Sequence, residues 1–446
     1  MKFVIVGGDA AGMSAASRAK RRSPDMEVTV LEQTSDVSYS ACGMPYNIAD
    51  PAREIDDLIV RPAQMFREKQ GIDLRTRYRV EVIDPARKTV RGTSVEGDPF
   101  QVPYDKLLIA TGASPIIPHL PGFDLPGVMG LKNLDDGRRI KRFIAEHDVT
   151  RAVIMGMGYI ALEMCEALRA RNIEVVMVKP GPVFLPWMHG DLSLMVREEV
   201  KANGIMLHTG HEVKGIEQAV GGLKVLCTDL ELEGQMVLVG VGVRPSSELA
   251  ENAGLALSVK KSIAVDKSLR TSNQDIYAAG DCADAYHVVT GQKTWIPLAL
   301  RANRAGWAAA DNITGEKVAL PGIAGSAVFK VFDLQVARTG LNVDEAKRAG
   351  FDPVEMMIQG RTRAHSHPGA SKIGVQMVGD RKTGRLLGVQ MVGREGAAHR
   401  IDAPAVALQA HMTVEEFVQC DLAYAPPFGP VWDPMLTAAN QLLKKL

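Results

Sequence analysis

Hydrophobic residues occur along the chain in short uninterrupted runs, several of which end in glycine. The run KFVIVGG at residues 2–8 predicts a buried strand that enters a glycine turn. Small residues dominate positions 10–23 and predict a helix, and MEVTVLE at 26–32 predicts a second strand. The start of the chain therefore forms one β-α-β unit.

A second unit of the same kind follows at residues 151–179. RAVIMGMG predicts its first strand, YIALEMCEALRAR its helix and IEVVMVK its second strand. Beyond residues 315–325 the pattern changes to strand-rich segments such as KIGVQMVGD, and RIDAPAVALQAHM predicts a helix. We predict a first dinucleotide-binding domain made of residues 1–115 and 245–321. A second dinucleotide-binding domain, residues 116–244, is inserted into it, and residues 322–446 form a third domain.

The composition narrows the class of protein. A chain of 446 residues is too long for one compact core. Its 52 lysines and arginines equal its 52 aspartates and glutamates, which gives no reason to expect nucleic acid as a partner. No apolar run approaches the roughly 18 residues of a membrane helix, and MKFVIVGG does not resemble a signal peptide. The five cysteines include no Cys-x-x-Cys pair, so we expect a cytoplasmic protein without disulfides or a metal site.

The first glycine turn has the form of a nucleotide-binding turn. Gly7 permits a tight turn and Gly12 allows close packing of strand and helix, whose first N–H groups suit a pyrophosphate. Asp9 replaces the usual middle glycine. Glu32 ends the second strand about 20 residues after Gly12, where a carboxylate accepts ribose hydroxyls. The alternative is a structural turn with a solvated glutamate.

The second glycine turn predicts a second nucleotide. Gly156, Gly158 and Ala161 form a G-x-G-x-x-A motif, with Glu163 one helical turn beyond Tyr159. Lys179 stands at the position that corresponds to Glu32. Since a lysine can pair with a 2′-phosphate, we favour NADPH over NADH; the alternative is a solvated lysine at a strand end.

Two later stretches carry a resemblance to a known family. YDKLLIATGASP ends a strand in Ala110-Thr111-Gly112, and TSNQDIYAAGDCAD ends another in Gly280-Asp281. With the two glycine turns, these motifs occur in the order seen in the flavin- and pyridine-nucleotide-dependent disulfide reductases, which the whole chain resembles. The resemblance implies an α/β fold with two Rossmann-like dinucleotide-binding domains, for FAD and NAD(P)H, plus a C-terminal α+β dimerisation domain.

The same resemblance assigns residues to each nucleotide. Asp281 is implied as the contact of the FAD ribityl chain, Ala299 as a neighbour of the flavin ring and Tyr159 as the cover of the nicotinamide pocket. The implied FAD residues are Gly7, Gly8, Ala10, Ala11, Gly12, Glu32, Val80, Ala110, Thr111, Gly112, Asp281 and Ala299. The implied NAD(P) residues are Gly156, Gly158, Tyr159, Ile160, Glu163, Lys179 and Gly242.

Cys42, in the segment VSYSACGMPY, resembles the redox cysteine of the single-cysteine branch of this family. That branch includes coenzyme A disulfide reductase, persulfide or polysulfide reductase and NADH oxidase. A lone thiol beside a reduced flavin must form a mixed disulfide with an external sulfur compound or a sulfenic acid with oxygen or peroxide. We expect a lowered pKa for Cys42 if a helix N-terminus and the flavin lie close. The four other cysteines are expected to be structural. Ala10 replaces the histidine of the peroxidase and oxidase relatives, which weakens the oxygen and peroxide alternatives.

The first helix carries a basic face. Ser14, Arg18 and Arg21 or Arg22 are spaced by three and four residues, and clustered cations suit a phosphate. The resemblance implies that Ser14, Arg18, Arg21, Arg22 and Ser38 bind coenzyme A. The alternative is a solvated basic helix end, which also suits the helix dipole.

The C-terminal segment DLAYAPPFGPVWDP at 421–434 resembles a loop that reaches the partner's cysteine in a homodimer. Tyr424 is implied as a proton donor, and a second family tyrosine is replaced at Ser366-His367, so that His367 is a further candidate. We predict an NAD(P)H-dependent reductase of coenzyme A disulfide, coenzyme A persulfide or polysulfide. The alternatives are an NAD(P)H oxidase that works through a Cys42 sulfenate and a flavoprotein redox sensor.

Overall fold

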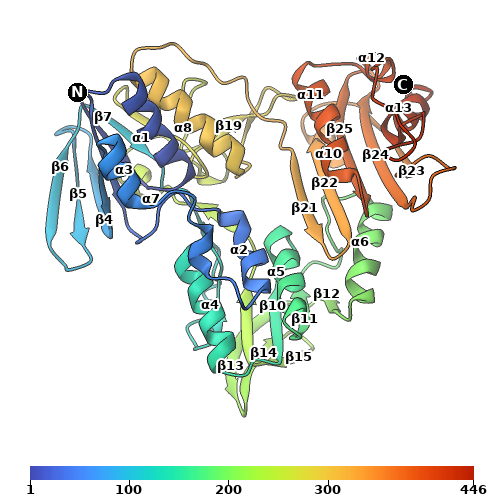
Figure 1. Cartoon of the computed structure of the whole chain (residues 1–446), viewed down its shortest axis with the longest axis horizontal. Coiled ribbons are helices and arrows are strands. Elements are labelled where there is room, and N and C mark those ends of the chain that lie inside the picture. Colours follow the sequence, from blue (N-terminus) through green and yellow to red (C-terminus); the bar gives the residue numbers. More distant parts are fainter.

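A computed structural model describes residues 1–446 and divides them into three parts, each built on a five-stranded sheet (Figure 1). In the view of Figure 1 the N-terminal part lies at the upper left, the C-terminal part at the upper right and the middle part below them. Two sheets are parallel and the third is antiparallel, which confirms the predicted α/β fold with a C-terminal α+β domain. No helix has the length and apolarity needed to cross a membrane.

The first parallel sheet follows the strand order β18-β7-β1-β2-β3. Phe3 to Val6 of β1 are buried because helices cover one face of this parallel sheet and a small antiparallel sheet packs against it from the other side. Helices α1 and α8 lie side by side on one face, as Figure 1 shows. The sheet strands are β1 (Lys2–Val6), β2 (Glu27–Glu32), β3 (Asp73–Thr76), β7 (Lys106–Ile109) and β18 (Ile276–Ala278). The helices of this part are α1 (Ala10–Arg22), α3 (Ala63–Gln70), α7 (Glu248–Asn252) and α8 (Ala299–Ile313), and its small antiparallel sheet contains β4 (Tyr78–Asp84), β5 (Thr89–Ser94) and β6 (Pro99–Pro103).

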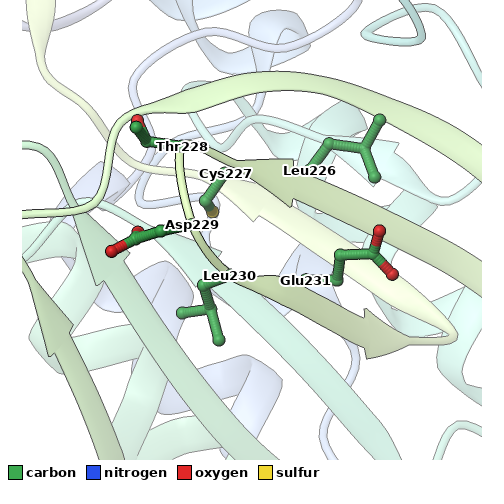
Figure 2. A pocket seen from close by; sticks show the side chains of 6 residues that line it. All are labelled: Leu226, Cys227, Thr228, Asp229, Leu230 and Glu231. Carbon is green, nitrogen blue, oxygen red and sulfur yellow. The ribbon is translucent and has the colours of Figure 1, made fainter.

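The second parallel sheet follows the order β12-β11-β10-β16-β9. Its strands are β9 (Val128–Met129), β10 (Arg151–Met155), β11 (Glu174–Lys179), β12 (Met206–Thr209) and β16 (Met236–Val239), and its helices are α4 (Leu134–Glu146), α5 (Tyr159–Ala170) and α6 (Gly190–Ala202). A small antiparallel sheet extends this part through β13 (Val213–Ala219), β14 (Gly222–Cys227) and β15 (Glu231–Gly234). A cavity of about 430 Å³ at the β14–β15 turn is lined by 226–231 and contains none of the predicted site residues (Figure 2).

The chain passes between the two parallel sheets at β8 (Ala113–Pro115) and β17 (Val243–Pro245), which pair antiparallel. The predicted domain limits stay a prediction. The third sheet has the order β21-β22-β25-β24-β23. Its strands are β21 (Ala327–Val331), β22 (Leu334–Gly340), β23 (Pro353–Arg361), β24 (Lys372–Asp380) and β25 (Leu386–Gly393), and its helices are α9 (Val343–Arg348), α10 (Ala397–Arg400), α11 (Asp402–Gln409), α12 (Val414–Val418) and α13 (Pro434–Leu443). A two-stranded ribbon, β19 (Ala285–Tyr286) with β20 (Lys293–Thr294), precedes α8.

The segment after β2 joins the first two parts. Helix α2 (Met44–Ala49) buries Met44 and Ile48 in the same hydrophobic cluster as the helices of the second part. Lys141 of α4 donates to the carbonyl oxygens of Asn47 and Asp50 at the end of α2, at 3.2 and 2.9 Å. Cations suit this end of a helix because its last carbonyls are unpaired. The segment that carries Cys42 is thus fixed to the second part although its sequence belongs to the first.

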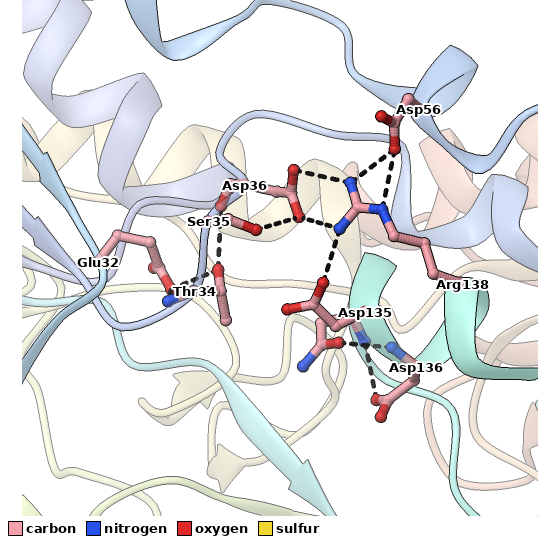
Figure 3. Close-up of polar contacts among 9 residues, drawn as sticks. Glu32, Thr34, Ser35, Asp36, Asp56, Asp135, Asp136 and Arg138 are labelled. Carbon is pink, nitrogen blue, oxygen red and sulfur yellow. Dashed lines mark hydrogen bonds and ion pairs between the residues drawn. The ribbon is translucent and has the colours of Figure 1, made fainter. Parts of the chain in front are cut away.

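Arg138 of α4 adds a polar connection between the same two parts, which Figure 3 shows. Its guanidinium donates to the carboxylates of Asp36, Asp56 and Asp135 at 2.6 to 3.0 Å. This arginine holds the pKa of Asp36 below its ordinary range, against the opposing effect of burial. Because one planar group binds three carboxylates, the loops after β2 and α2 are held to α4 together.

Candidate active site

The glycine turn after β1 brings three chain segments into close contact. Gly7 has a φ of +107°, and a Cβ atom there would lie 2.2 Å from the carbonyl oxygen of Ala110. A Cβ atom on Gly12 would lie 1.9 Å from the carbonyl oxygen of Gly7. Both positions therefore require glycine. Helix α1 begins at Ala10, so its unpaired N–H groups lie at this turn, where a pyrophosphate binds in folds of this kind.

Glu32 is buried beside this turn at the end of β2. One carboxylate oxygen accepts the N–H of Gly8 at 2.7 Å. The other accepts the N–H and the hydroxyl of Thr34 at 2.7 and 2.8 Å, beside the cluster in Figure 3. The oxygen that accepts the Gly8 N–H keeps a second lone pair, so the carboxylate can also accept a ribose hydroxyl. The two required glycines and this fixed carboxylate fit the ADP portion of FAD.

Asp9 departs from the usual turn because it stands where the middle glycine is expected. Its Oδ1 atom is buried and has no hydrogen-bond partner. Burial raises the pKa of Asp9 to about 6; Lys132 opposes this shift, and the carboxylates of Glu32 and Asp281 support it. The Lys132 Nζ lies 3.7 Å from the Asp281 carboxylate and provides a cation at the same place. Sequence reasoning missed Lys132, which directly precedes the capped start of α4 at Asn133.

Two further turns lie at the carboxyl ends of the strands of the first sheet. Ala110 to Gly112 follow β7, and the Thr111 hydroxyl donates to the Ser246 carbonyl at 2.5 Å. Gly280 and Asp281 follow β18. The buried Arg301, in the first turn of α8, donates to the Gly280 carbonyl at 2.9 Å, so α8 starts at this site.

The remaining residues implied for FAD lie in different surroundings, and some of them are buried in the core. Ala299 is the exposed first residue of α8, next to the Gly280 turn. Val80 lies in β4 with its side chain buried in the hydrophobic core, which leaves only its main chain for a ligand. Ala11 is buried in α1, and a Cβ atom on Gly306 of α8 would lie 2.2 Å from its carbonyl oxygen. Ala11 therefore serves the packing of α1 against α8.

The second glycine turn repeats the geometry of the first in the other parallel sheet. Gly156 has a φ of +101°, and a Cβ atom there would lie 2.2 Å from the carbonyl oxygen of Gly240. No atom lies within 4 Å of a Cβ atom added to Gly158, so the space beside it is open to a pyrophosphate. Ile160 is exposed at the start of α5, and Gly242 follows β16 with a φ of +128°. This turn fits a second dinucleotide.

Tyr159 packs between the second and third parts of the chain. Its ring stacks on Phe329 of β21 with 4.8 Å between centroids and meets Trp187 edge-on at 5.5 Å. The ring is only partly buried, so one side stays accessible beside the glycine turn. Its role as the cover of the nicotinamide pocket stays a prediction.

Lys179 lies at the end of β11, as predicted, but its ammonium group already has a partner. The Nζ atom donates to the Val183 carbonyl at 2.6 Å, and burial lowers the pKa of Lys179. Binding a 2′-phosphate would require Lys179 to exchange this carbonyl for the phosphate. The preference for NADPH over NADH stays a prediction.

Cys42 lies in a 3₁₀ turn, Ala41–Gly43, directly before α2, and is the one exposed cysteine of the chain. The lowered pKa that we expect for Cys42 if a helix N-terminus and the flavin lie close stays a prediction, because it concerns the protein with FAD bound. The protein around the sulfur partly excludes water and raises the pKa of Cys42, and the carboxylates of Glu163 and Asp281 add to this effect. Lys132 opposes it. A site that contains both carboxylates favours the thiol over the thiolate.

A tyrosine that sequence reasoning left without a role connects Cys42 with the second nucleotide turn. Tyr46 lies four residues after Cys42, and its hydroxyl donates to Glu163 of α5 at 3.1 Å. Burial raises the pKa of Glu163 to about 7, although the Tyr46 hydrogen bond opposes the shift. Glu163 can therefore hold or release a proton near neutral pH. The signal was present in the sequence, since Tyr46 belongs to the same ACGMPY segment as Cys42.

The basic face of α1 lies against α8, and carboxylates in and just after α8 bind two of its cations. Arg18 donates two hydrogen bonds to Asp311 at 2.8 and 3.1 Å. Arg22 pairs with Asp311 at 3.4 Å and with Glu316. Arg18 and Arg22 therefore have acidic partners that the spacing on α1 could not reveal, and their role in binding coenzyme A stays a prediction. Arg21 is exposed and makes no ion pair.

The two other residues implied for coenzyme A lie apart from each other. The Ser14 hydroxyl donates to the Asn303 side chain of α8 at 2.6 Å. Ser38 has a φ of +52°, and its N–H donates to the Gly8 carbonyl at 3.3 Å, so it lies at the first glycine turn. The structure thus places Ser38 near the predicted FAD site and Ser14 on the basic face.

The C-terminal loop and the loop of His367 lie together. The N–H of Ala364 donates to the Pro426 carbonyl at 3.0 Å, and Arg400 donates to the Phe428 carbonyl at 2.7 Å. Tyr424 is 48% exposed, so its hydroxyl is available outside its own subunit. His367 is half-buried in the adjacent turn. The structure therefore brings the two candidate proton donors into one loop pair.

The other cysteines take the structural positions expected of them. Cys165 and Cys282 are fully buried in hydrophobic clusters, and Cys227 and Cys420 are half-buried. No group of three or more histidine, cysteine or acidic side chains forms a metal-binding arrangement. Cys42 is therefore the one thiol that the chain leaves exposed.

Comparison with known proteins shows the family to which the whole chain belongs. Residues 1–306 match the profile described as pyridine nucleotide-disulphide oxidoreductase, and residues 326–435 match the profile of its dimerisation domain. The chain is 37% identical over 442 residues to a CoA-dependent NAD(P)H sulfur oxidoreductase of Pyrococcus furiosus, with 99% of each chain covered. It is 33% identical over 450 residues to an NADH oxidase of Methanocaldococcus jannaschii, with 100% of this chain and 99% of the relative covered. The solved NAD-dependent persulfide reductase from A. fulgidus superposes with a TM-score of 0.96 at 35% identity, covering 100% of this chain and 83% of that one.

Proposed function

Because the chain belongs to the pyridine nucleotide-disulphide oxidoreductase family, we propose that it reduces coenzyme A disulfide, coenzyme A persulfide or polysulfide through Cys42. The protein is an oxidoreductase that uses FAD and NAD(P)H, as the resemblance implied. FAD, when bound, supplies the chemistry that connects oxidation of the nicotinamide with reduction of a disulfide. Gly7, Gly12, Glu32 and Asp281 would hold it.

One observation carries the proposal: Cys42 is a lone exposed thiol between the two nucleotide-binding turns. Asp281 of the first part and Glu163 of the second part both act on its pKa. All four other cysteines are buried or half-buried, so no internal thiol is positioned to resolve a bond on Cys42. The sulfur partner must therefore come from outside the chain.

The reaction balances with an external disulfide. The Cys42 thiolate attacks one sulfur, a bond forms between Cys42 and that sulfur, and the bond between the two substrate sulfurs breaks. The departing thiolate takes a proton. Two electrons from NAD(P)H break the mixed disulfide, so NAD(P)H, one proton and RSSR yield NAD(P)⁺ and two RSH. Glu163, with its pKa of about 7, is placed to exchange a proton near Cys42.

A homodimer completes the proposed site. The C-terminal loop exposes Tyr424 together with Phe428, Val431 and Trp432. An apolar segment of this kind marks an interface when a partner covers it. We assign the covering partner to a second copy of the chain, whose Cys42 would receive Tyr424, or His367, as the proton donor. The cytoplasmic location stays a prediction.

Reduction of oxygen through a Cys42 sulfenate is the second candidate. It draws support from the relative named NADH oxidase. Ala10 weakens it, because alanine at the start of α1 offers no proton to a peroxide bound at Cys42. A redox sensor without turnover is the third candidate, and it predicts no consumption of NAD(P)H with any of these acceptors.

The deciding experiment measures anaerobic NADPH and NADH consumption by the FAD-loaded protein with coenzyme A disulfide, coenzyme A persulfide or no acceptor. Turnover that requires the coenzyme A compound and disappears in Cys42→Ser supports the reductase. Cys227→Ser is the matched control, because this half-buried thiol lies far along the chain in β14, and it should retain turnover. Rapid NAD(P)H loss only after air is admitted would contradict the proposal and favour the oxidase.

A further inference from the structure

Helix α8 exposes two large apolar side chains on one face. Trp307 is 47% exposed and Leu300 is 62% exposed. They are separated by seven residues, which is two helical turns, so they lie on the same face. Tryptophan is rarely left this exposed on a single-chain surface without a partner. The neighbours of this indole indicate what the partner is.

Trp307 lies on the face of α8 that borders the basic face of α1. Asn303, Trp307 and Asp311 are spaced by four residues and therefore share one stripe. Asn303 accepts the Ser14 hydroxyl at 2.6 Å, and Asp311 accepts Arg18 at 2.8 Å. The indole is thus attached between two residues that contact α1, on helices that lie side by side in Figure 1.

Cations surround this position. Arg304, one turn before Trp307, is exposed and takes part in no ion pair or hydrogen bond, and Arg21 of α1 makes no ion pair. Arg18 uses its Nε and Nη2 atoms on Asp311, so its Nη1 group keeps its donors for a ligand. An aromatic platform beside guanidinium groups that keep free donors suits a base that carries phosphates.

The same helix leads from this position to the redox site. Arg301, six residues before Trp307, donates to the Gly280 carbonyl beside Asp281. At 1.5 Å per residue, Trp307 lies about 9 Å further along the helix axis. A ligand with its base on Trp307 and a flexible arm along α8 would therefore place the end of that arm toward Cys42.

We propose that the indole of Trp307 stacks on the adenine base of the coenzyme A portion of the substrate. Arg21, Arg304 and the remaining donors of Arg18 then bind its phosphate groups. This inference rests on the proposed function, because it takes coenzyme A as the carrier of the reacting sulfur. It assigns specificity to α8 as well as to α1. The competing occupant of the exposed stripe is a second copy of the chain, which the test below distinguishes.

The test uses the FAD-loaded protein and adenosine 3′,5′-bisphosphate, which lacks sulfur and cannot react. Its dissociation constant is measured by calorimetry for the wild type, Trp307→Phe and Trp307→Leu. We expect Trp307→Leu to weaken binding by about five-fold or more, since base stacking on an aromatic ring is lost, and Trp307→Phe to stay within about two-fold. Val95→Ala, an exposed apolar position on the same part of the chain, is the control and should bind as the wild type.

Kinetics separate this inference from the function on which it rests. Trp307→Leu should raise KM for coenzyme A disulfide by a similar factor and leave KM unchanged for pantethine, which lacks the adenosine phosphates. Equal bisphosphate binding by the wild type and Trp307→Leu, no binding by the wild type, or a dimer that dissociates in sedimentation of Trp307→Leu would overturn the inference. If the wild type binds the bisphosphate through Trp307 but does not turn over coenzyme A disulfide, the proposed function is wrong and the base site stands.

Discussion

Replacing Asp9 with asparagine is expected to make FAD binding nearly independent of pH between 6 and 8. Asp9 stands at the turn that would hold the pyrophosphate, and its Oδ1 atom is buried without a partner. The pyrophosphate is negatively charged, so it binds more favourably when Asp9 is protonated. Asparagine has nearly the same shape and carries no charge, so it removes the titration and keeps the packing.

The magnitude follows from the pKa of about 6 that burial imposes on Asp9. Because burial raises the pKa of Asp9 from 3.8 to about 6, Asp9 is protonated in the folded apoprotein below pH 6. As the pH rises through about 6, Asp9 ionises, and the favourable contribution of its protonated form to FAD binding is lost. Above pH 6, FAD affinity should fall by up to ten-fold per pH unit. Between pH 6 and pH 8 the loss reaches at most about fifty-fold, equivalent to about 2 kcal/mol.

The assay is the FAD dissociation constant of the apoprotein, followed by flavin fluorescence from pH 5 to pH 8.5. The wild type should show the weakening, and Asp9→Asn should give a flat profile that meets the wild-type curve at low pH. Asp36→Asn is the matched control, because the Asp36 pKa is lowered rather than raised and Asp36 should not titrate in this range. An unchanged slope in Asp9→Asn would refute the reasoning and assign the titration to another group.

Three further predictions test other parts of the site. Glu163→Gln removes a carboxylate that raises the Cys42 pKa, so the pH midpoint of Cys42 alkylation by iodoacetamide should move to lower pH; a midpoint that stays or rises contradicts the assignment. Gly12→Ala should yield FAD-free, poorly folded protein because its Cβ atom meets a carbonyl oxygen at 1.9 Å, whereas Gly158→Ala should fold normally and retain FAD, as measured by the flavin absorbance of the purified proteins. Arg138→Leu should lower the melting temperature by several degrees at pH 7 through loss of its three carboxylate partners. The effect should shrink only below the ordinary aspartate pKa of 3.8, because the pKa of Asp36 is lowered and its ion pair persists until the pH falls through that lowered value. Scanning calorimetry at pH 7 and at about pH 3 measures both, and equal losses would contradict the ion-pair account.

Much of the architecture was predictable because local patterns determine it. Strand β1 and helix α1 follow from an apolar run, a glycine turn and a stretch of small residues, each of which acts within a few positions of the chain. The equivalence of Gly7 and Gly156 was also visible, since a turn that excludes a Cβ atom leaves glycine as its signature. Because such local patterns are visible in the sequence itself, the predicted family, fold class and cofactors were confirmed.

The partners of the charged side chains were decided only by the tertiary structure. The spacing on α1 placed Arg18 and Arg22 on one face, but Asp311 neutralises them from a helix almost 300 positions later in the chain. The raised pKa of Cys42 likewise depends on Glu163, which α5 brings to it from the second part. Electrostatic energies depend on distance and burial between segments far apart in sequence, and neither is encoded in a local pattern. The sequence by itself therefore determined which turns, strands and thiol this protein has, while the packing of its three parts decided which charges those groups experience.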